Sequence, residues 1–234
     1  MSEELSSRAR ERILAAWASA VGTPPDELRR GEETIVERPD LAAVIVAEVD
    51  GHRLVAAPPI VVDTVRAAAW EALIDAHALA RMLPVPAAPI GTADLLFTER
   101  RPDRPWVRVT EAGPADLRAV RTGVAESEWQ ESGLDEMHRA WVSWAAEGRP
   151  AAVAGFSPWH THLAQLGVIA RAEGRRAGFA SAAAATAVRA AIEAGLIAQW
   201  RSRRGNDASM RLGQRLGFVR LGVQSAAALT ASRP

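Results

Sequence analysis

The sequence contains no cysteine, no lysine and no tyrosine, and the first absence excludes several kinds of chemistry. Without cysteine, the 234-residue chain has no disulfide, no thiolate ligand for a metal and no thiol nucleophile. All 28 basic residues are arginine, and eight tryptophans supply most of the aromatic volume. With 48% hydrophobic residues, the chain can bury a sizeable core as one large domain or two small ones.

The sequence also lacks a long apolar run of the kind that enters membranes. Its first twelve residues are charged and contain no apolar core of a signal peptide. The uncharged run 150–170 includes Pro158, His160, His162 and Gln165, which a bilayer-spanning helix does not accommodate comfortably. We therefore expect a cytoplasmic protein without a membrane partner.

Charge is balanced overall but unevenly distributed. Residues 171–234 contain eleven arginines against three acidic residues, a net charge of +8, so residues 1–170 carry −8. Such asymmetry indicates an anionic partner for the C-terminal part, with a solvated basic face as the alternative. Nucleic acid is the weaker candidate, because no long basic stripe is present.

The N-terminal part alternates helix and strand patterns. Apolar residues at helical spacing predict a helix over residues 4–20. Residues 41–59 predict a β-hairpin, because Asp50 and Gly51 stand between two β-branched runs and are typical of a type I′ turn.

A further helix is expected over residues 63–83, with Asp63 as its cap, and a short strand over 91–99. The segment 100–105 is polar and proline-rich, so we place a domain boundary there. The predicted domains are residues 1–105 and residues 106–234.

The C-terminal part has strand and helix patterns in alternation. Its expected helices begin at Pro114, at Gly178 and at Asn206, the last ending near Leu216. Its expected strands lie at 106–109, in two parts of 141–156 around Glu147 and Gly148, at 161–170, at 196–201 and as a final pair.

A basic turn separates the strand that ends at Ala170 from an alanine-rich helix. The turn supplies Arg175 and Arg176, and Gly178 opens the helix. A helix N-terminus has unpaired N–H groups and a partial positive charge that attract phosphate, and glycine lets a ligand approach the backbone. Neither GxGxxG nor a GKS or GKT motif is present. The turn predicts an anion site, with a plain connection carrying surface arginines as the alternative.

Two motifs together resemble the GNAT superfamily of N-acetyltransferases. Residues 175–180, RRAGFA, match RxxGxA, a form of the Q/RxxGxG/A motif of that family. Residues 206–218, NDASMRLGQRLGF, are similar to a later helix of the family that begins with Asn and ends in LGF. The resemblance covers residues 106–230 well and residues 1–105 loosely. In finer detail, EWQESG, GVIARAEGRRAGFA, QWR and GFVRLGVQSAAAL resemble an actinobacterial-type group with an extra N-terminal region.

The resemblance implies a mixed α/β fold, with a central, mostly antiparallel sheet flanked by helices and a smaller N-terminal α/β region. It also implies acetyl-CoA as co-substrate, direct transfer of the acetyl group to an amine on a small molecule or protein, and no metal. In the family, the first motif wraps the pyrophosphate of coenzyme A, the preceding strand binds the pantetheine arm through its backbone, and the Asn contacts the cofactor. The cofactor-binding residues implied for this chain are Val168, Ile169, Ala170, Arg175, Arg176, Ala177, Gly178, Phe179, Ala180 and Asn206.

The catalytic groups are less directly indicated. Many GNAT members have a Tyr general acid seven residues after this Asn, where this chain has Gly213. Because a thiolate is a tolerable leaving group and general acid catalysis is worth about 10²–10⁴-fold, its loss slows the reaction without abolishing it. Ser209 is the candidate to position a water or donate a hydrogen bond in its place.

A base for the amine is expected among histidines or acidic residues. If the strand at 161–170 extends back to His160, alternation puts His160 and His162 on one face, and His162 becomes the candidate base. The other candidates are Glu126, Glu128 and Glu131, whose alternative is a solvated acidic surface.

Two other functions stay open from the sequence. A non-catalytic acyl-CoA-binding regulatory module could keep the cofactor site, and the helix at 206–216 could contact DNA. The acceptor, the acyl chain length and the oligomeric state, including a homodimer, are not specified by the residues.

Overall fold

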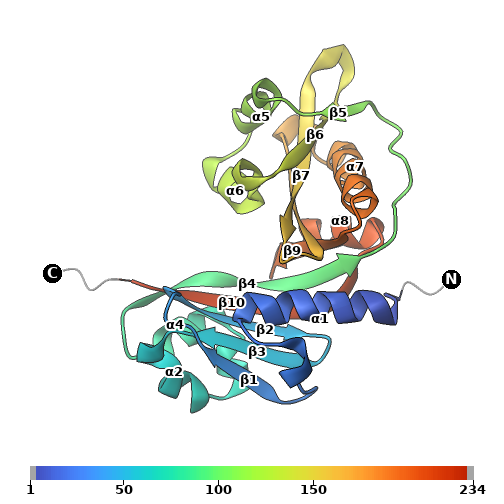
Figure 1. The fold of residues 1–234 in the computed structure, drawn as a ribbon. Helices are drawn as coiled ribbons and strands as arrows, with labels where there is room; N and C mark the ends of the chain where they lie inside the picture. The colour runs from blue at the N-terminus through green and yellow to red at the C-terminus, as the bar shows by residue number, and fades with distance from the viewer. Residues whose placement is uncertain (1–3, 231–234) are drawn as a thin grey trace. The chain divides into compact units, whose positions relative to one another are not determined.

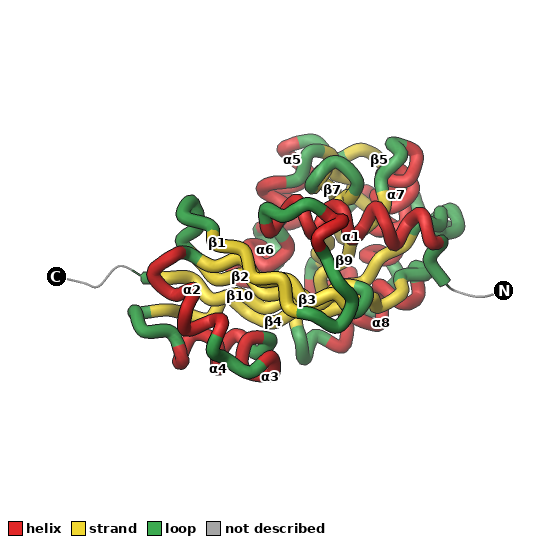
Figure 2. Tube along the Cα trace, turned by 60° about the horizontal axis from the view of Figure 1, so that its bottom comes forward, coloured by secondary structure: helices red, strands yellow, loops and turns green. Residues whose placement is uncertain are grey.

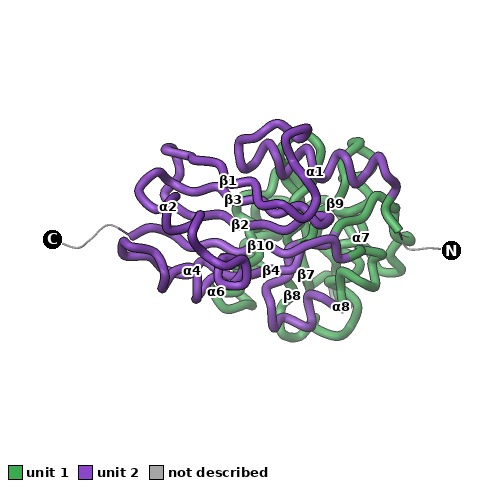
Figure 3. The backbone as a smooth tube through the Cα atoms, turned by 90° about the horizontal axis from the view of Figure 1, so that it is seen from below, with its two compact units in different colours: residues 1–5, 97–200, 211–219 green, residues 6–96, 201–210, 220–234 purple. Residues whose placement is uncertain are grey.

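The computed structural model describes residues 4–230, and the chain forms two compact units (Figure 3). Unit 1 consists of Met1–Leu5, Phe97–Trp200 and Arg211–Val219. Unit 2 consists of Ser6–Leu96, Arg201–Met210 and Arg220–Pro234. Among the described residues, no helix is long and apolar enough to cross a membrane.

Unit 2 contains a sheet with helices. Its strands, yellow in Figure 2, follow the order β1-β3-β2-β10-β4. Strand β1 is parallel to β3, and β2 is antiparallel to both β3 and β10. The elements are α1 (Ser7–Val21), the 3-10 turn η1 (Pro25–Glu27), β1 (Glu33–Glu37), β2 (Ala43–Val49), β3 (His52–Ala57), α2 (Pro59–Arg66), α3 (Trp70–Leu73), α4 (Ala76–Met82), β4 (Ala87–Thr98) and β10 (Val219–Leu229).

Both faces of this sheet are buried, because alternate residues of a strand point to opposite sides. Val44, Val46 and Val55 belong to a core cluster that also includes apolar residues of α2, α3 and α4. Leu54 and Ala56 lie at the alternate positions of β3 and are also fully buried. Helix α1 contacts β2 and β3 (Figure 1), so it covers this second face.

Unit 1 contains the first sequence motif, residues 175–180, and residues 211–218 of the second, whose residues 206–210 belong to unit 2. Its strands follow the order β9-β8-β7-β6-β5, antiparallel except for the parallel pair β8 and β9. The elements are β5 (Val109–Glu111), α5 (Pro114–Arg121), α6 (Glu126–Ser132), η2 (Leu134–Glu136), β6 (Arg139–Trp144), η3 (Ala146–Gly148), β7 (Pro150–Trp159), β8 (Leu163–Ala170), η4 (Ala172–Gly174), α7 (Phe179–Glu193), β9 (Ile197–Arg203) and α8 (Asp207–Arg215). Residues 201–203 of β9 and 207–210 of α8 belong to unit 2.

Helices flank the strands of unit 1 on both sides. Helix α7 packs on β6, β7 and β8, whereas α5 contacts β7 and α6 contacts β8. Figure 1 shows α7 on the opposite side of these strands from α5 and α6. The predicted fold class, a mixed α/β fold with a mostly antiparallel sheet flanked by helices, is confirmed.

Several local predictions are also confirmed. Asp50 and Gly51 both have positive φ, 49° and 78°, as a type I′ hairpin turn requires. Pro114 occupies the first turn of α5, where its missing N–H costs nothing.

The single helix expected over residues 63–83 is wrong, because three short helices, α2, α3 and α4, occupy residues 59–82. Asp63 lies inside α2, which begins at Pro59. The backbone is extended at Ala69 and at Asp75, where new helices begin, and the Asp75 carboxylate accepts a hydrogen bond from the N–H of Ala78 at 2.7 Å. A capping side chain in mid-segment therefore restarts the helix.

Two strand predictions also need correction. The strand expected at 106–109 instead begins at Val109, so Trp106 lies in the preceding loop. The expected pair of final strands is one long strand, β10, whose residues 222–228 pair continuously with β2.

Candidate functional site

Strands β8 and β9 separate partway along their length. Their parallel register runs from Leu163 with Ile197 to Gln165 with Gln199. Strand β8 continues to Ala170 and stays paired with β7 along its other edge. Beyond Gln165, β8 therefore has one edge that is not paired with β9.

The hydrogen-bond pattern identifies the residues whose backbone groups face this edge. The N–H of Arg171 donates to the carbonyl of Ala151 at 3.0 Å, so residues of its parity, including Ile169, direct their backbone groups toward β7. The carbonyl of His162 accepts from the N–H of Ile197 at 3.0 Å, so even-numbered residues face β9. Past the paired positions these are Leu166, Val168 and Ala170.

A basic turn leads from this edge into helix α7. Arg176 has φ 62° and Gly178 has φ 85°, and Gly178 is the N-cap without any side-chain cap. The N–H of Ala182 makes the first intrahelical bond, to the carbonyl of Gly178 at 3.0 Å. The N–H groups of Phe179, Ala180 and Ser181 therefore have no acceptor within the helix, and they give this end its positive potential.

One arginine of the turn is held by α6. Arg175 donates to both carboxylate oxygens of Glu128, each at 2.8 Å, and both side chains are about half exposed. This hydrogen bond lowers the pKa of Glu128 below its usual range. The missing side chain of Gly167 lets the carbonyl of Ser132, at the end of α6, approach β8 closely.

A parallel strand pair that separates, followed by a glycine turn into an uncapped helix, agrees with the sequence motifs. A model of the acetyltransferase (GNAT) family matches residues 97–218, more than half of the chain. The chain belongs to the GNAT family. No curated protein matches the sequence.

Solved GNAT structures are similar to this chain at low sequence identity. A GCN5-related N-acetyltransferase-like protein from Streptococcus suis is 13% identical with a TM-score of 0.52, and 96% of this chain aligns with 99% of it. A GCN5-related N-acetyltransferase from Kribbella flavida is 22% identical with a TM-score of 0.43, covering 67% of this chain and 64% of that one. An acetyltransferase of the GNAT family from Colwellia psychrerythraea is 16% identical with a TM-score of 0.47, covering 62% of this chain and 57% of that one. The chain thus spans less than two thirds of the latter two proteins.

Gly178 of the GNAT motif is in contact with another residue of unit 1. A Cβ atom built on Gly178 would lie 3.2 Å from Cζ2 of Trp106, tighter than almost all real contacts of a Cβ. The absent side chain therefore makes room for an indole as well as permitting the left-handed backbone.

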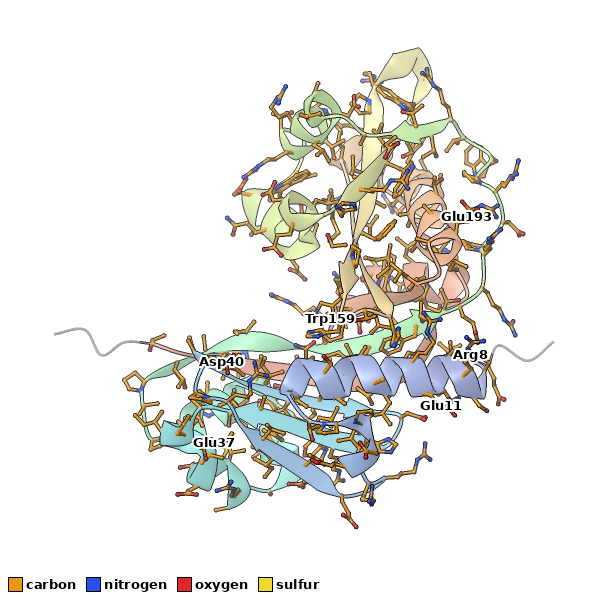
Figure 4. The ribbon with its side chains drawn as sticks, viewed as in Figure 1. Arg8, Glu11, Glu37, Asp40, Trp159 and Glu193 are labelled. Atoms are coloured by element: carbon orange, nitrogen blue, oxygen red, sulfur yellow. The ribbon has the colours of Figure 1, made fainter. Side chains whose placement is uncertain are left out.

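The two histidines near β8 do not alternate on a strand as expected. His160 and Thr161 have positive φ, 42° and 65°, and form the turn between β7 and β8, which begins at Leu163. Figure 4 labels Trp159 at the end of β7, and its ring meets the His160 ring edge-on with centroids 4.4 Å apart. His162 is half-buried. It precedes Leu166, the first residue of the open edge of β8, by four residues, which span about 13 Å in an extended strand.

The second GNAT motif forms α8 as expected. The Asn206 side-chain oxygen accepts a hydrogen bond from the N–H of Ser209 at 3.0 Å, so Asn206 caps the helix where it was expected to begin. Gly217, with φ 82°, follows the helix end. Within unit 1, Gly213 packs on Trp200: a Cβ at Gly213 would lie 3.6 Å from the indole ring.

A pair of glutamines marks the point where β8 and β9 separate, and the sequence reading did not single it out. Gln199 Nε2 donates to Gln165 Oε1 at 2.8 Å, and Gln165 Nε2 donates to the carbonyl of Leu166 at 2.9 Å. Gln199 is completely buried. A glutamine at the third position of each strand, after two apolar residues, is the signal that could have indicated this pair.

Proposed function

We propose that this GNAT protein is an N-acetyltransferase that transfers an acetyl group directly from acetyl-CoA to an amine. One observation carries the proposal: the open edge of β8 leads through the Gly178 turn directly into the uncapped N-terminus of α7. This arrangement offers backbone groups to an extended polar chain and N–H groups to a phosphate within one continuous segment.

The pantetheine arm would lie along the open edge of β8 and form hydrogen bonds with the backbone groups of Val168 and Ala170. Leu166 joins them in this proposal because its backbone faces the same way. Ile169 was a sequence candidate too, but its backbone groups are directed toward β7 and its side chain packs in the core of unit 1. Its contribution is therefore to hold the strand in place.

The pyrophosphate would lie at the start of α7. The N–H groups of Phe179 and Ala180 are oriented for it, and Ala177 and Gly178 shape the turn. Arg175 and Arg176 supply positive charge. Asn206 is proposed as a further cofactor contact through the resemblance of its motif, in addition to its role as a cap.

In the reaction, the neutral amine attacks the thioester carbonyl, a C–N bond forms and the C–S bond breaks. A backbone N–H of the open edge would stabilise the oxyanion that develops. The amine must lose one proton, for which His162 is the proposed base, and the thiolate gains one. Ser209 is proposed to position the water or hydrogen bond for the thiolate.

We further propose that residues 106–234 form the acetyltransferase domain and that residues 1–105 are an extension of the actinobacterial type. The limits of the family match, 97–218, support the first part of this proposal. The competing function is a non-catalytic acyl-CoA-binding module. Turnover on a panel of small amines, polyamines and peptides with acetyl-CoA separates the two, because such a module binds the thioester without consuming it.

Substitution of Gly178 tests the site itself. We expect Gly178→Val to weaken CoA binding, measured by calorimetry, by at least about tenfold, because valine is strained at this φ and crowds the α7 N–H groups. The control is Gly195→Val at the other end of α7, where φ is 79° and a Cβ meets nothing within 4 Å. Both variants carry similar backbone strain, but only Gly178→Val should weaken CoA binding.

The contact with Trp106 requires one more variant. Gly178→Val in a Trp106→Ala background removes the side-chain clash while the backbone strain stays. If this double variant is folded and binds CoA as tightly as Trp106→Ala alone, the turn is not the phosphate site.

A further inference from the structure

Trp106 is 80% exposed, although tryptophan is among the side chains that gain most from burial. It belongs to unit 1 and lies in the loop between β4 and β5. The edge of its indole faces Gly178, at the phosphate-binding turn proposed above. One side of a large aromatic surface is thus fixed at the turn while most of the ring remains in solvent.

The loop that carries Trp106 is anchored along α7. Arg189 donates to the carbonyl of Pro102 at 2.9 Å, and Arg101 pairs with Glu193, labelled on α7 in Figure 4, at 3.7 Å. These contacts hold residues 101 and 102 on α7, and the edge of the Trp106 indole lies against Gly178 at the start of the same helix.

The surroundings match one part of the proposed co-substrate. In coenzyme A, the pyrophosphate joins the pantetheine arm to an adenosine that carries a 3′-phosphate. A pyrophosphate held by the α7 N–H groups would place this adenosine near the turn 175–178, which contains Arg175 and Arg176 and whose Gly178 contacts Trp106. A flat π surface beside cationic groups is the chemistry that recognises a nucleotide base next to phosphates.

We propose that Trp106 is an adenine-binding residue that stacks on the base of the acyl-CoA. The inference rests on the proposed function and adds a specificity: the protein should prefer nucleotide-bearing CoA thioesters to acyl-phosphopantetheine, the form presented by carrier proteins. Its occupant is the adenine ring, because stacking needs a base and the turn already binds the adjoining phosphates.

Calorimetry with two ligands tests this proposal. CoA carries the adenosine, whereas 4′-phosphopantetheine lacks it. Trp106→Ala should weaken the binding of CoA by about tenfold or more, as expected for the loss of one base stack. It should leave the affinity for phosphopantetheine unchanged. Trp106→Phe should lie between the wild type and Trp106→Ala, because a smaller ring still stacks. Ile90→Ala, which removes another exposed apolar side chain, is the control and should change neither affinity.

Fluorescence gives a readout of the indole itself. CoA should protect Trp106 from an aqueous quencher, whereas phosphopantetheine should not, and Trp106→Phe should abolish the difference. Equal weakening of both ligands in Trp106→Ala would show that the indole only supports the Gly178 turn. Unchanged or tighter binding of both ligands in Trp106→Ala would show that the indole covers the site. Each of these two results would overturn the adenine-binding role of Trp106 and would leave the proposed acetyltransferase function untouched. A wild type that binds neither ligand refutes the proposed function as well.

Discussion

Two glycines of unit 1 lie against tryptophan rings, and their backbones give the two contacts different meanings. Gly178 has a left-handed backbone and a space already reduced by Trp106. Gly213 has an ordinary helical backbone inside α8, and the space beside it allows a Cβ at 3.6 Å from Trp200. A methyl group at the first position is therefore strained by the backbone and requires Trp106 to shift, whereas at the second position it makes an ordinary contact.

Gly213→Ala should stabilise the protein by about 0.5–1 kcal/mol. Glycine in a helix costs about this much relative to alanine, and the added methyl makes an ordinary contact with buried Trp200. The measurement is the free energy of unfolding in denaturant. Gly217→Ala is the matched control four residues later, where φ is 82°, and it should destabilise by about 1 kcal/mol. Destabilisation by Gly213→Ala would mean that α8 cannot accommodate a Cβ against Trp200.

At the scale of elements, the turn before α7 and the helix α6 share one ion pair. Arg175 is proposed to bind phosphate, yet Glu128 already takes two hydrogen bonds from it. A carboxylate at this place repels an incoming phosphate, so the two anions compete for one guanidinium. Cofactor binding at the turn is thereby coupled to α6.

Glu128→Gln should tighten CoA binding by up to about fivefold, because exposed ion pairs of this kind are worth up to about 1 kcal/mol. Calorimetry at neutral pH is suitable, since a glutamate carboxylate is charged there and the hydrogen bond from Arg175 lowers the pKa of Glu128 further. Glu126→Gln removes an equal charge from the same helix but breaks a pair with Arg121 instead, so it should leave CoA affinity nearly unchanged. Weaker binding in Glu128→Gln would mean that Glu128 orients Arg175 for the phosphate.

Elements with strong local signals could be predicted from the sequence. Three such features depend on the backbone or side-chain preferences of one or two adjacent residues. They are the Asp50-Gly51 hairpin turn, the start of a helix at Pro114 and the cap at Asn206. Interruption of the helix at Asp75 was missed because apolar spacing continues through it.

The candidate site, too, could be predicted only where a local motif marks it. The motif identified the turn, but the choice of Leu166 over Ile169 depends on which edge of β8 is paired, and this is a property of the sheet. The contact between Trp106 and Gly178 joins residues 72 positions apart, and no local pattern encodes it.

At the scale of the whole molecule, the last strand belongs with the first part of the chain. Residues 222–228 of β10 pair with β2, and both strands lie in unit 2. Buried Ala227 belongs to a cluster whose other fully buried members all come from residues 44–83. The fold of the C-terminal segment therefore depends on residues that precede the family match.

This dependence predicts the behaviour of a fragment. Residues 106–234 expressed alone should aggregate, because β10 would lose both of its neighbours in the sheet, β2 and β4, and would expose the apolar residues that β2 and its cluster cover in the full chain. Size-exclusion chromatography and circular dichroism compare this fragment with the full chain and with residues 106–218, which lack β10 and should aggregate less. A monomeric 106–234 fragment that unfolds cooperatively would contradict the argument, because β10 would then have found a partner without β2.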